Sequence, residues 1–163
     1  METPNHYVDI KFEYENKIIN KARLGGARIY KNAILLTPGE WSDSVTRAPV
    51  LYSSEELNKG HKRWMGNYLN VNHSWNVEDR IGLVRNPSFK SDKVLADLYI
   101  YPITQRSKDV IALIDAGLVN NLSVELATKD IWDAKKNMRV AKDIRFIGLA
   151  VVTDPADPNT RIK

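Results

Sequence analysis

The sequence lacks several features that would point to familiar classes of site. It contains no cysteine, which excludes a disulfide framework, a thiolate metal site and a cysteine nucleophile. No apolar run approaches the roughly 20 residues that cross a bilayer, so we expect no membrane partner. The sequence also has no Gly-x-Ser-x-Gly or His-Glu-x-x-His motif. An α/β-hydrolase and a zinc peptidase are therefore disfavoured, and we expect neither a cofactor nor a metal.

The composition is that of an ordinary globular protein, with 43% hydrophobic and 27% charged residues. A chain of 163 residues suits one domain, here 1–163 with a core of roughly 7–158. The 24 basic and 20 acidic residues are interspersed and leave a net charge of only +4. Charge alone therefore gives no reason to expect a nucleic-acid partner. Assembly into a homo-oligomer stays open.

Alternation of apolar and polar residues predicts strands along much of the chain. The expected strands are 8–14, 28–37, 69–73, 80–84, 93–101, 122–126 and 143–152. The segment 41–52 has no clear period, and we expect it to loop across the surface. Ser53 or Ser54 can cap a helix whose apolar positions recur as far as Met65, and Thr104 can cap a second one.

The order of these elements predicts a fold class that is mainly β with flanking helices (α+β). Most of the strands are neighbours in sequence, which favours antiparallel pairing. We therefore expect an antiparallel β-barrel of about seven strands.

His73 and Ser123 are the residues whose settings could carry chemistry. His73 ends an apolar alternation of Leu69 and Val71, and Ser123 lies on the strand face opposite Leu122 and its apolar neighbours. A serine hydrolase needs a hydroxyl nucleophile and a base within hydrogen-bond reach. Taken singly, each residue is more often an ordinary polar residue of a strand than a catalytic one. For the two to meet, a twist or bulge is needed near His73.

The order of four short motifs resembles the prohead (capsid maturation) proteases of tailed bacteriophages, relatives of the herpesvirus assemblins. The motifs are Asn-His at 72–73, Ile-Gly-x-Val at 81–84, Leu-Ser-Val at 122–124, and Ala-x-Val-Thr-x-Pro-Ala-x-Pro at 150–158. The resemblance covers about 33–158 and implies an assemblin-like barrel. It implies a serine endopeptidase, with His73 as general base and Ser123 as nucleophile, that cleaves scaffold and capsid proteins and itself. Its place would be the host cytoplasm, inside the assembling prohead.

The third catalytic residue departs from the pattern of this family. The family has a His or Glu just before the Val-Thr-x-Pro segment, where this chain has Gly148. Asp97 is the first candidate replacement and Glu125, on the same strand face as Ser123, is the second. For each, a solvated surface charge is the alternative interpretation. His73 and Ser123 could also act as a dyad, or the chain could be a catalytically inactive β-barrel module of a virion.

The last residues carry a further expectation. Pro155 and Pro158 have no N–H to donate, so strand pairing should stop there. We therefore expect the polar segment 159–163 to pack little, as an engineered or processed end of the chain.

Overall fold

The computed structural model describes residues 26–42 and 47–163. Its strands are β1 (Arg28–Leu36), β2 (Gly39–Ser42), β3 (Pro49–Tyr52), β4 (Tyr68–Val71), β5 (Arg80–Lys90), β6 (Lys93–Ile100), β7 (Asn121–Asp133) and β8 (Met138–Val152). Its helices are α2 (Ser54–Gly60) and α3 (Gln105–Asp115), with short 3-10 turns η1 (His61–Arg63) and η2 (Val77–Asp79). The prediction of a mainly β fold with flanking helices is confirmed. The strand predicted over 8–14 lies outside the described residues.

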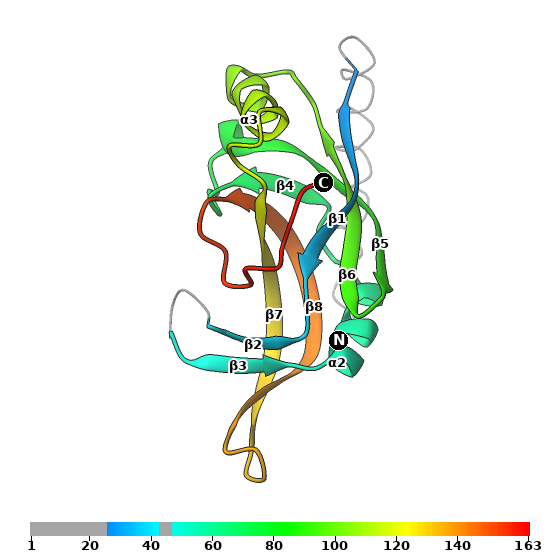
Figure 1. The fold of residues 1–163 in the computed structure, drawn as a ribbon, viewed down its shortest axis with the longest axis vertical. Coiled ribbons are helices and arrows are strands. Elements are labelled where there is room, and N and C mark those ends of the chain that lie inside the picture. Colours follow the sequence, from blue (N-terminus) through cyan, green and yellow to red (C-terminus); the bar gives the residue numbers. More distant parts are fainter. Residues whose placement is uncertain (1–25, 43–46) are drawn as a thin grey trace, which may run out of the picture.

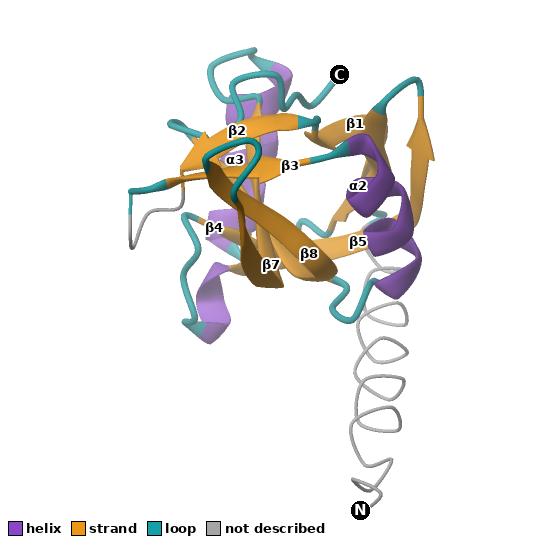
Figure 2. Ribbon diagram, turned by 90° about the horizontal axis from the view of Figure 1, so that it is seen from below, coloured by secondary structure: helices purple, strands orange, loops and turns teal. Residues whose placement is uncertain are grey.

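All eight strands belong to one sheet, which curls around the core (Figures 1 and 2). The strand order is β1-β6-β5-β4-β8-β3-β2, and β7 pairs with β8 beside this path. The central strand is therefore β8, which pairs with β7 on one edge and with β3 and β4 on the other. The residues enclosed by the sheet are almost wholly buried, among them Leu35, Leu69, Leu98, Ile100, Leu122, Phe146 and Leu149.

Two features of the sheet differ from the sequence prediction. The sheet is mixed, because β3 and β4 both run parallel to β8. The chain crosses from β3 to β4 through α2 and η1, and a helical crossover lets it return without reversing direction. The segment 41–52, expected to be a surface loop, contains the end of β2 and all of β3, which pair as antiparallel strands. Each has only four residues, too few to show a clear period.

Both helices begin where the sequence predicted. Ser53 caps α2 by accepting a hydrogen bond from the Glu56 N–H, and Thr104 caps α3 through a reciprocal pair of bonds with Ser107. However, α2 ends at Gly60, so the predicted continuation to Met65 is replaced by η1 and an extended segment. Within the described residues, neither helix has the length and apolar character needed to cross a membrane.

The expectation that 159–163 packs little is wrong. Thr160 and Ile162 are only 3% and 5% exposed. Arg161 forms a two-way antiparallel bridge with Ile34 of β1, and the Ile162 N–H donates to the Asn120 carbonyl just before β7. Strand pairing stops before the prolines, as predicted, but it resumes at Arg161, three residues after Pro158. This C-terminal segment (160–162) therefore joins β1 to the beginning of β7.

Candidate active site

His73 lies in a tight turn directly after β4. Asn72 and His73 have φ angles of 53° and 56°, in the left-handed region that few residues other than Gly and Asn favour. The pairing of β4 with β5 shifts register between Leu69 and Asn70, so the irregularity predicted near His73 is confirmed. The strand itself ends at Val71, and the turn, rather than strand alternation, sets the direction of the imidazole.

Ser123 and Glu125 project from the same face of β7, because successive side chains of a strand alternate. On β8, their partners are Ala150 and Gly148, respectively. The same two β8 residues pair on the other edge with Asn70 and Tyr68 of β4. Two rows therefore cross the three strands, Ser123–Ala150–Asn70 and Glu125–Gly148–Tyr68. Residues more than 50 positions apart in sequence meet through this register.

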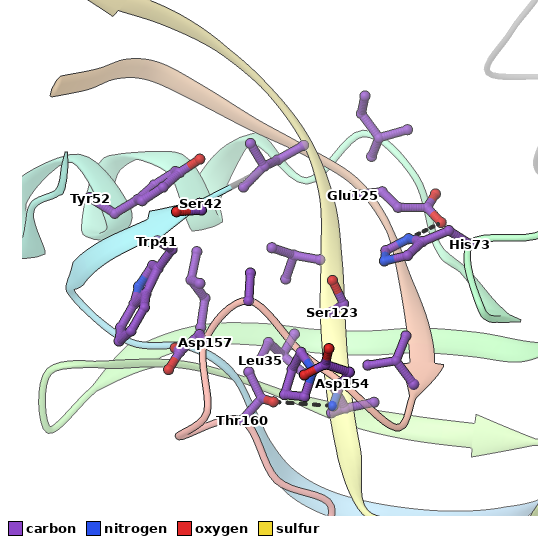
Figure 3. Close-up of a pocket in the computed structure, with 18 of the residues that line it drawn as sticks. Leu35, Trp41, Ser42, Tyr52, His73, Ser123, Glu125, Asp154, Asp157 and Thr160 are labelled. Carbon is purple, nitrogen blue, oxygen red and sulfur yellow. Dashed lines mark hydrogen bonds and ion pairs between the residues drawn. The ribbon is translucent and has the colours of Figure 1, made fainter. Parts of the chain in front are cut away.

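The His73 ring reaches back over the sheet to Glu125 (Figure 3). Its Nδ1 lies 3.0 Å from Glu125 Oε1. A carboxylate can only accept a hydrogen bond, so Nδ1 carries a proton, and in the neutral imidazole the lone pair is then on Nε2. Figure 3 shows this second nitrogen on the side where Ser123 lies. The imidazole is thus in the tautomer that a general base needs.

Glu125 is held by two further donors. The Tyr68 hydroxyl donates to Oε2, and Asn70 Nδ2 donates to Oε1 at 2.7 Å. The Glu125 side chain is only 13% exposed, whereas that of His73 is 41% exposed. Burial raises the pKa of the Glu125 carboxyl, but hydrogen bonds from His73, Tyr68 and Asn70 outweigh burial and hold this pKa below its usual value. The carboxylate is therefore charged and fixed in place.

Gly148 makes this arrangement sterically possible. A Cβ atom on Gly148 would lie 2.3 Å from Cε2 of the Tyr68 ring. The ring crosses β8 over the bare Gly148 backbone to reach Glu125, and the Arg80 guanidinium stacks 4.2 Å from its centroid. Tyr68 and Asn70 were not among the site residues predicted from the sequence. One feature of the sequence could have indicated them: both side chains can form hydrogen bonds, and they stand two residues apart on the strand that precedes His73.

The structure does not bring Asp97 to this site. Asp97 lies on β6, where its carboxylate accepts hydrogen bonds from Lys31 Nζ at 3.0 Å, the Asn32 N–H at 3.0 Å and Asn86 Nδ2 at 2.9 Å. It is 7% exposed, so neither Asp97 nor Glu125 is the solvated surface charge that strand alternation suggested. Asp97 ties β1 and β5 to β6, whereas Glu125 contacts His73.

Ser123 and His73 line the same groove on the molecular surface. Across 26–42 and 47–163, no hydrogen bond joins the Ser123 hydroxyl to the imidazole, and the bond from His73 goes to Glu125. The structure therefore brings His73, Ser123 and Glu125 into one groove. The same part of the chain contains no group of three or more His, Asp or Glu side chains arranged to hold a metal.

Comparison with known proteins gives a similarity of fold. No protein-family model matches the chain, and no curated protein matches it by sequence. Among solved structures, the bacteriophage T4 capsid assembly protease, gp21, is similar, with a TM-score of 0.51 and 18% sequence identity. The match covers 78% of this chain and 92% of the T4 chain. The fold expected from the resemblance to prohead proteases is thus confirmed.

Proposed function

We propose that this protein is a serine endopeptidase of phage head assembly. Ser123 is the nucleophile, His73 the general base, and Glu125, rather than Asp97, the carboxylate that orients the imidazole. The observation that carries the proposal is the bond from His73 Nδ1 to the buried Glu125 carboxylate, in the groove that Ser123 also lines. This is the arrangement that makes an imidazole basic at Nε2 and stabilises its protonated form.

The reaction then follows the general course of serine proteolysis. His73 Nε2 takes the proton of the Ser123 hydroxyl as the oxygen attacks the scissile carbonyl carbon. The same proton passes to the amine of the leaving peptide when the C–N bond breaks, which leaves an acyl-enzyme. Water, deprotonated by His73, hydrolyses the ester and restores Ser123. Glu125 stays charged throughout and stabilises the imidazolium.

The biological setting rests on similarity of fold. The T4 neighbour is described as a capsid assembly protease, and the sequence motifs point to the same group. We infer that the substrates are scaffold and capsid proteins of an assembling prohead in the host cytoplasm, and that the protease also cleaves itself.

A catalytically inactive β-barrel module of a virion is the second candidate. The feature that favours it is Gly148, where the resemblance would put a catalytic His or Glu. Glu125 offers a carboxylate from the neighbouring strand instead, at 3.0 Å from the imidazole. This substitution favours the active enzyme.

A fluorophosphonate probe separates the two candidates. We expect the probe to label the protein at Ser123, and co-expressed scaffold protein to be processed. Ser123→Ala should abolish both while leaving the unfolding transition unchanged. Replacement of Ser54, which lies on α2 and outside the groove lining, by alanine is the matched control and should change neither. Full scaffold processing by Ser123→Ala would contradict the proposal.

A further inference from the structure

The hairpin that joins β7 to β8 carries two exposed apolar side chains at its far end. Ile131 and Trp132 are 49% and 63% exposed. With Val140 of the opposite strand, they line a depression between the hairpin and the beginning of α2, at Ser53 and Glu55. Figure 1 shows the turn of this hairpin at one end of the molecule, beyond β2 and β3. Large apolar side chains exposed together in a hollow are typical of a binding surface. We call this region, 131–136, the hairpin tip.

Two exposed lysines at the turn, Lys135 and Lys136, line the same depression. The Asp133 carboxylate accepts hydrogen bonds from their main-chain N–H groups at 3.0 and 3.2 Å, which closes the turn. Over 26–42 and 47–163, no carboxylate lies within ion-pair distance of either ammonium group. The other lysines and arginines of the two strands at this end are paired with carboxylates: Lys129, Arg139 and Lys142. The hairpin tip therefore presents two positive charges without a neutralising partner beside its apolar side chains.

The hairpin and the groove at Ser123 have opposite charge. Residues 129–145 include six basic and three acidic residues, which is a net charge of +3 in a chain whose total is +4. The titratable side chains described at the groove are His73, Glu125, Asp154 and Asp157, and none of these is a lysine or arginine. From Ser123 to Trp132, β7 spans nine residues, or about 30 Å at roughly 3.3 Å per residue. An acidic stretch of polypeptide is therefore attracted to the hairpin and repelled from the groove.

The charges of the hairpin favour an acidic protein segment over a nucleic acid. A nucleic-acid backbone carries a negative charge at every nucleotide, so it would also place phosphates beside Asp130 and Asp133. A protein segment can place its few carboxylates at Lys135 and Lys136 alone. It can also bring an aliphatic or aromatic side chain to the hollow beside Trp132, as the apolar centre of a protein interface does. The ligand that fits is thus an acidic polypeptide segment containing an apolar side chain.

We propose that the hairpin tip is a docking site for an acidic segment of the substrate protein, separate from the groove in which cleavage takes place. Because an extended chain spans at most about 3.3–3.6 Å per residue, at least about nine residues separate this segment from the scissile bond. Docking at the hairpin tip raises the local concentration of the cleavage sequence near Ser123. This assignment of the partner rests on the proposed peptidase function, because it takes the docked protein to be the substrate.

Binding is tested in Ser123→Ala, so that the result does not depend on hydrolysis. The probes are fluorescein-labelled peptides of Glu and Ser with a single Leu or Phe, and matched peptides in which Lys replaces Glu. Each is titrated with the protein and followed by fluorescence anisotropy. We expect the acidic peptides to bind and the basic ones not to bind. Binding should weaken as NaCl is raised from about 50 to about 500 mM, because exposed charges are screened.

Substitutions at two different hairpins locate the site. The double variant Lys135→Glu, Lys136→Glu should weaken binding of the acidic peptides by about tenfold or more, because it replaces attraction by repulsion. Trp132→Ala should weaken binding by a similar factor, and Trp132→Phe should retain most of it. The matched control is Lys90→Glu, Lys93→Glu, at two exposed lysines that pair across the β5–β6 hairpin, and it should leave binding unchanged.

Processing connects the docking site to the reaction. In the chain that retains Ser123, the variant Lys135→Glu, Lys136→Glu should slow processing of co-expressed scaffold protein by about tenfold or more. Its rate of fluorophosphonate labelling should stay unchanged, because a small probe enters the groove without touching the hairpin.

Equal effects of the two double lysine variants would overturn the proposal. Tighter binding of a thymidine oligonucleotide than of the acidic peptides at the hairpin tip would assign the site to nucleic acid instead. A dimer in sedimentation that Trp132→Ala dissociates, without any peptide binding, would make the hairpin tip an interface between copies. Failure of the peptidase function would show differently, as absence of labelling at Ser123 in the native chain while acidic peptides still bind to Ser123→Ala.

Discussion

Replacing Gly148 with alanine should displace the Tyr68 ring and so release one of the donors to Glu125. The new Cβ would lie 2.3 Å from Tyr68 Cε2 and 2.5 Å from Cζ. Carbon atoms in van der Waals contact are about 3.5 Å apart or more, so the ring must move by about 1.2 Å. A movement of that size breaks the hydrogen bond from the Tyr68 hydroxyl to Glu125.

The expected magnitude follows from that lost bond. A hydrogen bond to a charged group contributes about 1.5–3 kcal/mol. If all of it is lost from the transition state, the rate falls by roughly 10- to 160-fold. The steric clash should also lower the free energy of unfolding by about 1–3 kcal/mol. The assays are the rate of peptide hydrolysis, the rate of fluorophosphonate labelling, and urea unfolding.

Further variants separate the effect of losing the hydroxyl hydrogen bond from the effect of the steric clash. Tyr68→Phe should lower the rate by a similar factor with little steric cost, and the double variant should be no slower than Gly148→Ala alone, because both changes remove the same bond. Gly60→Ala is the control for steric crowding. Its Cβ would lie 3.0 Å from the Cβ of Ile144, a residue of β8 that does not contact Glu125, so the rate should be unchanged. Wild-type rates in both Gly148→Ala and Tyr68→Phe would refute the role of Tyr68.

Three further outcomes follow from the same site. Glu125→Gln should lower turnover by roughly 10²- to 10⁴-fold, whereas Asp97→Asn should lower only the free energy of unfolding; equal losses of turnover would contradict the assignment of Glu125. The double variant of His73→Ala and Ser123→Ala should be about as inactive as either single one, and additive losses would argue against a shared mechanism. Because its pKa is lowered in the folded protein, Glu125 contributes stability that is present above about pH 4.3 and lost as the pH falls through the folded pKa. Urea unfolding at pH 7 and pH 3 should therefore show a smaller acid-induced loss in Glu125→Gln, and an equal loss would refute the linkage.

Several parts of the fold could be predicted from sequence because their signals are local. Alternation located β1, β6 and the core of β8, and the caps at Ser53 and Thr104 marked where α2 and α3 begin. Each of these signals compares residues only a few positions apart. Local motifs likewise singled out His73 and Ser123, and strand alternation offered Asp97 and Glu125 as candidates for the third residue.

Strand direction and strand partners depend on distant segments. The parallel pairing of β3 and β4 with β8 follows from the crossover through α2, which no local pattern reports. The packing of 160–162 depends on Ile34, Asn120 and Leu122, and its short polar sequence gives no sign of these partners.

The choice between Asp97 and Glu125 as partner of His73 was also decided by tertiary structure. Both carboxylates lie on the predicted solvent side of their strands, so alternation does not show which of them contacts His73. The register across β8 brings Tyr68 opposite Gly148 and Gly148 opposite Glu125, and the missing side chain of Gly148 lets the ring pass. Sequence alone determined which residue types were present to do chemistry. Which of them meet was decided by pairing between strands, because hydrogen-bond geometry acts over a few ångströms in space, whatever the separation along the chain.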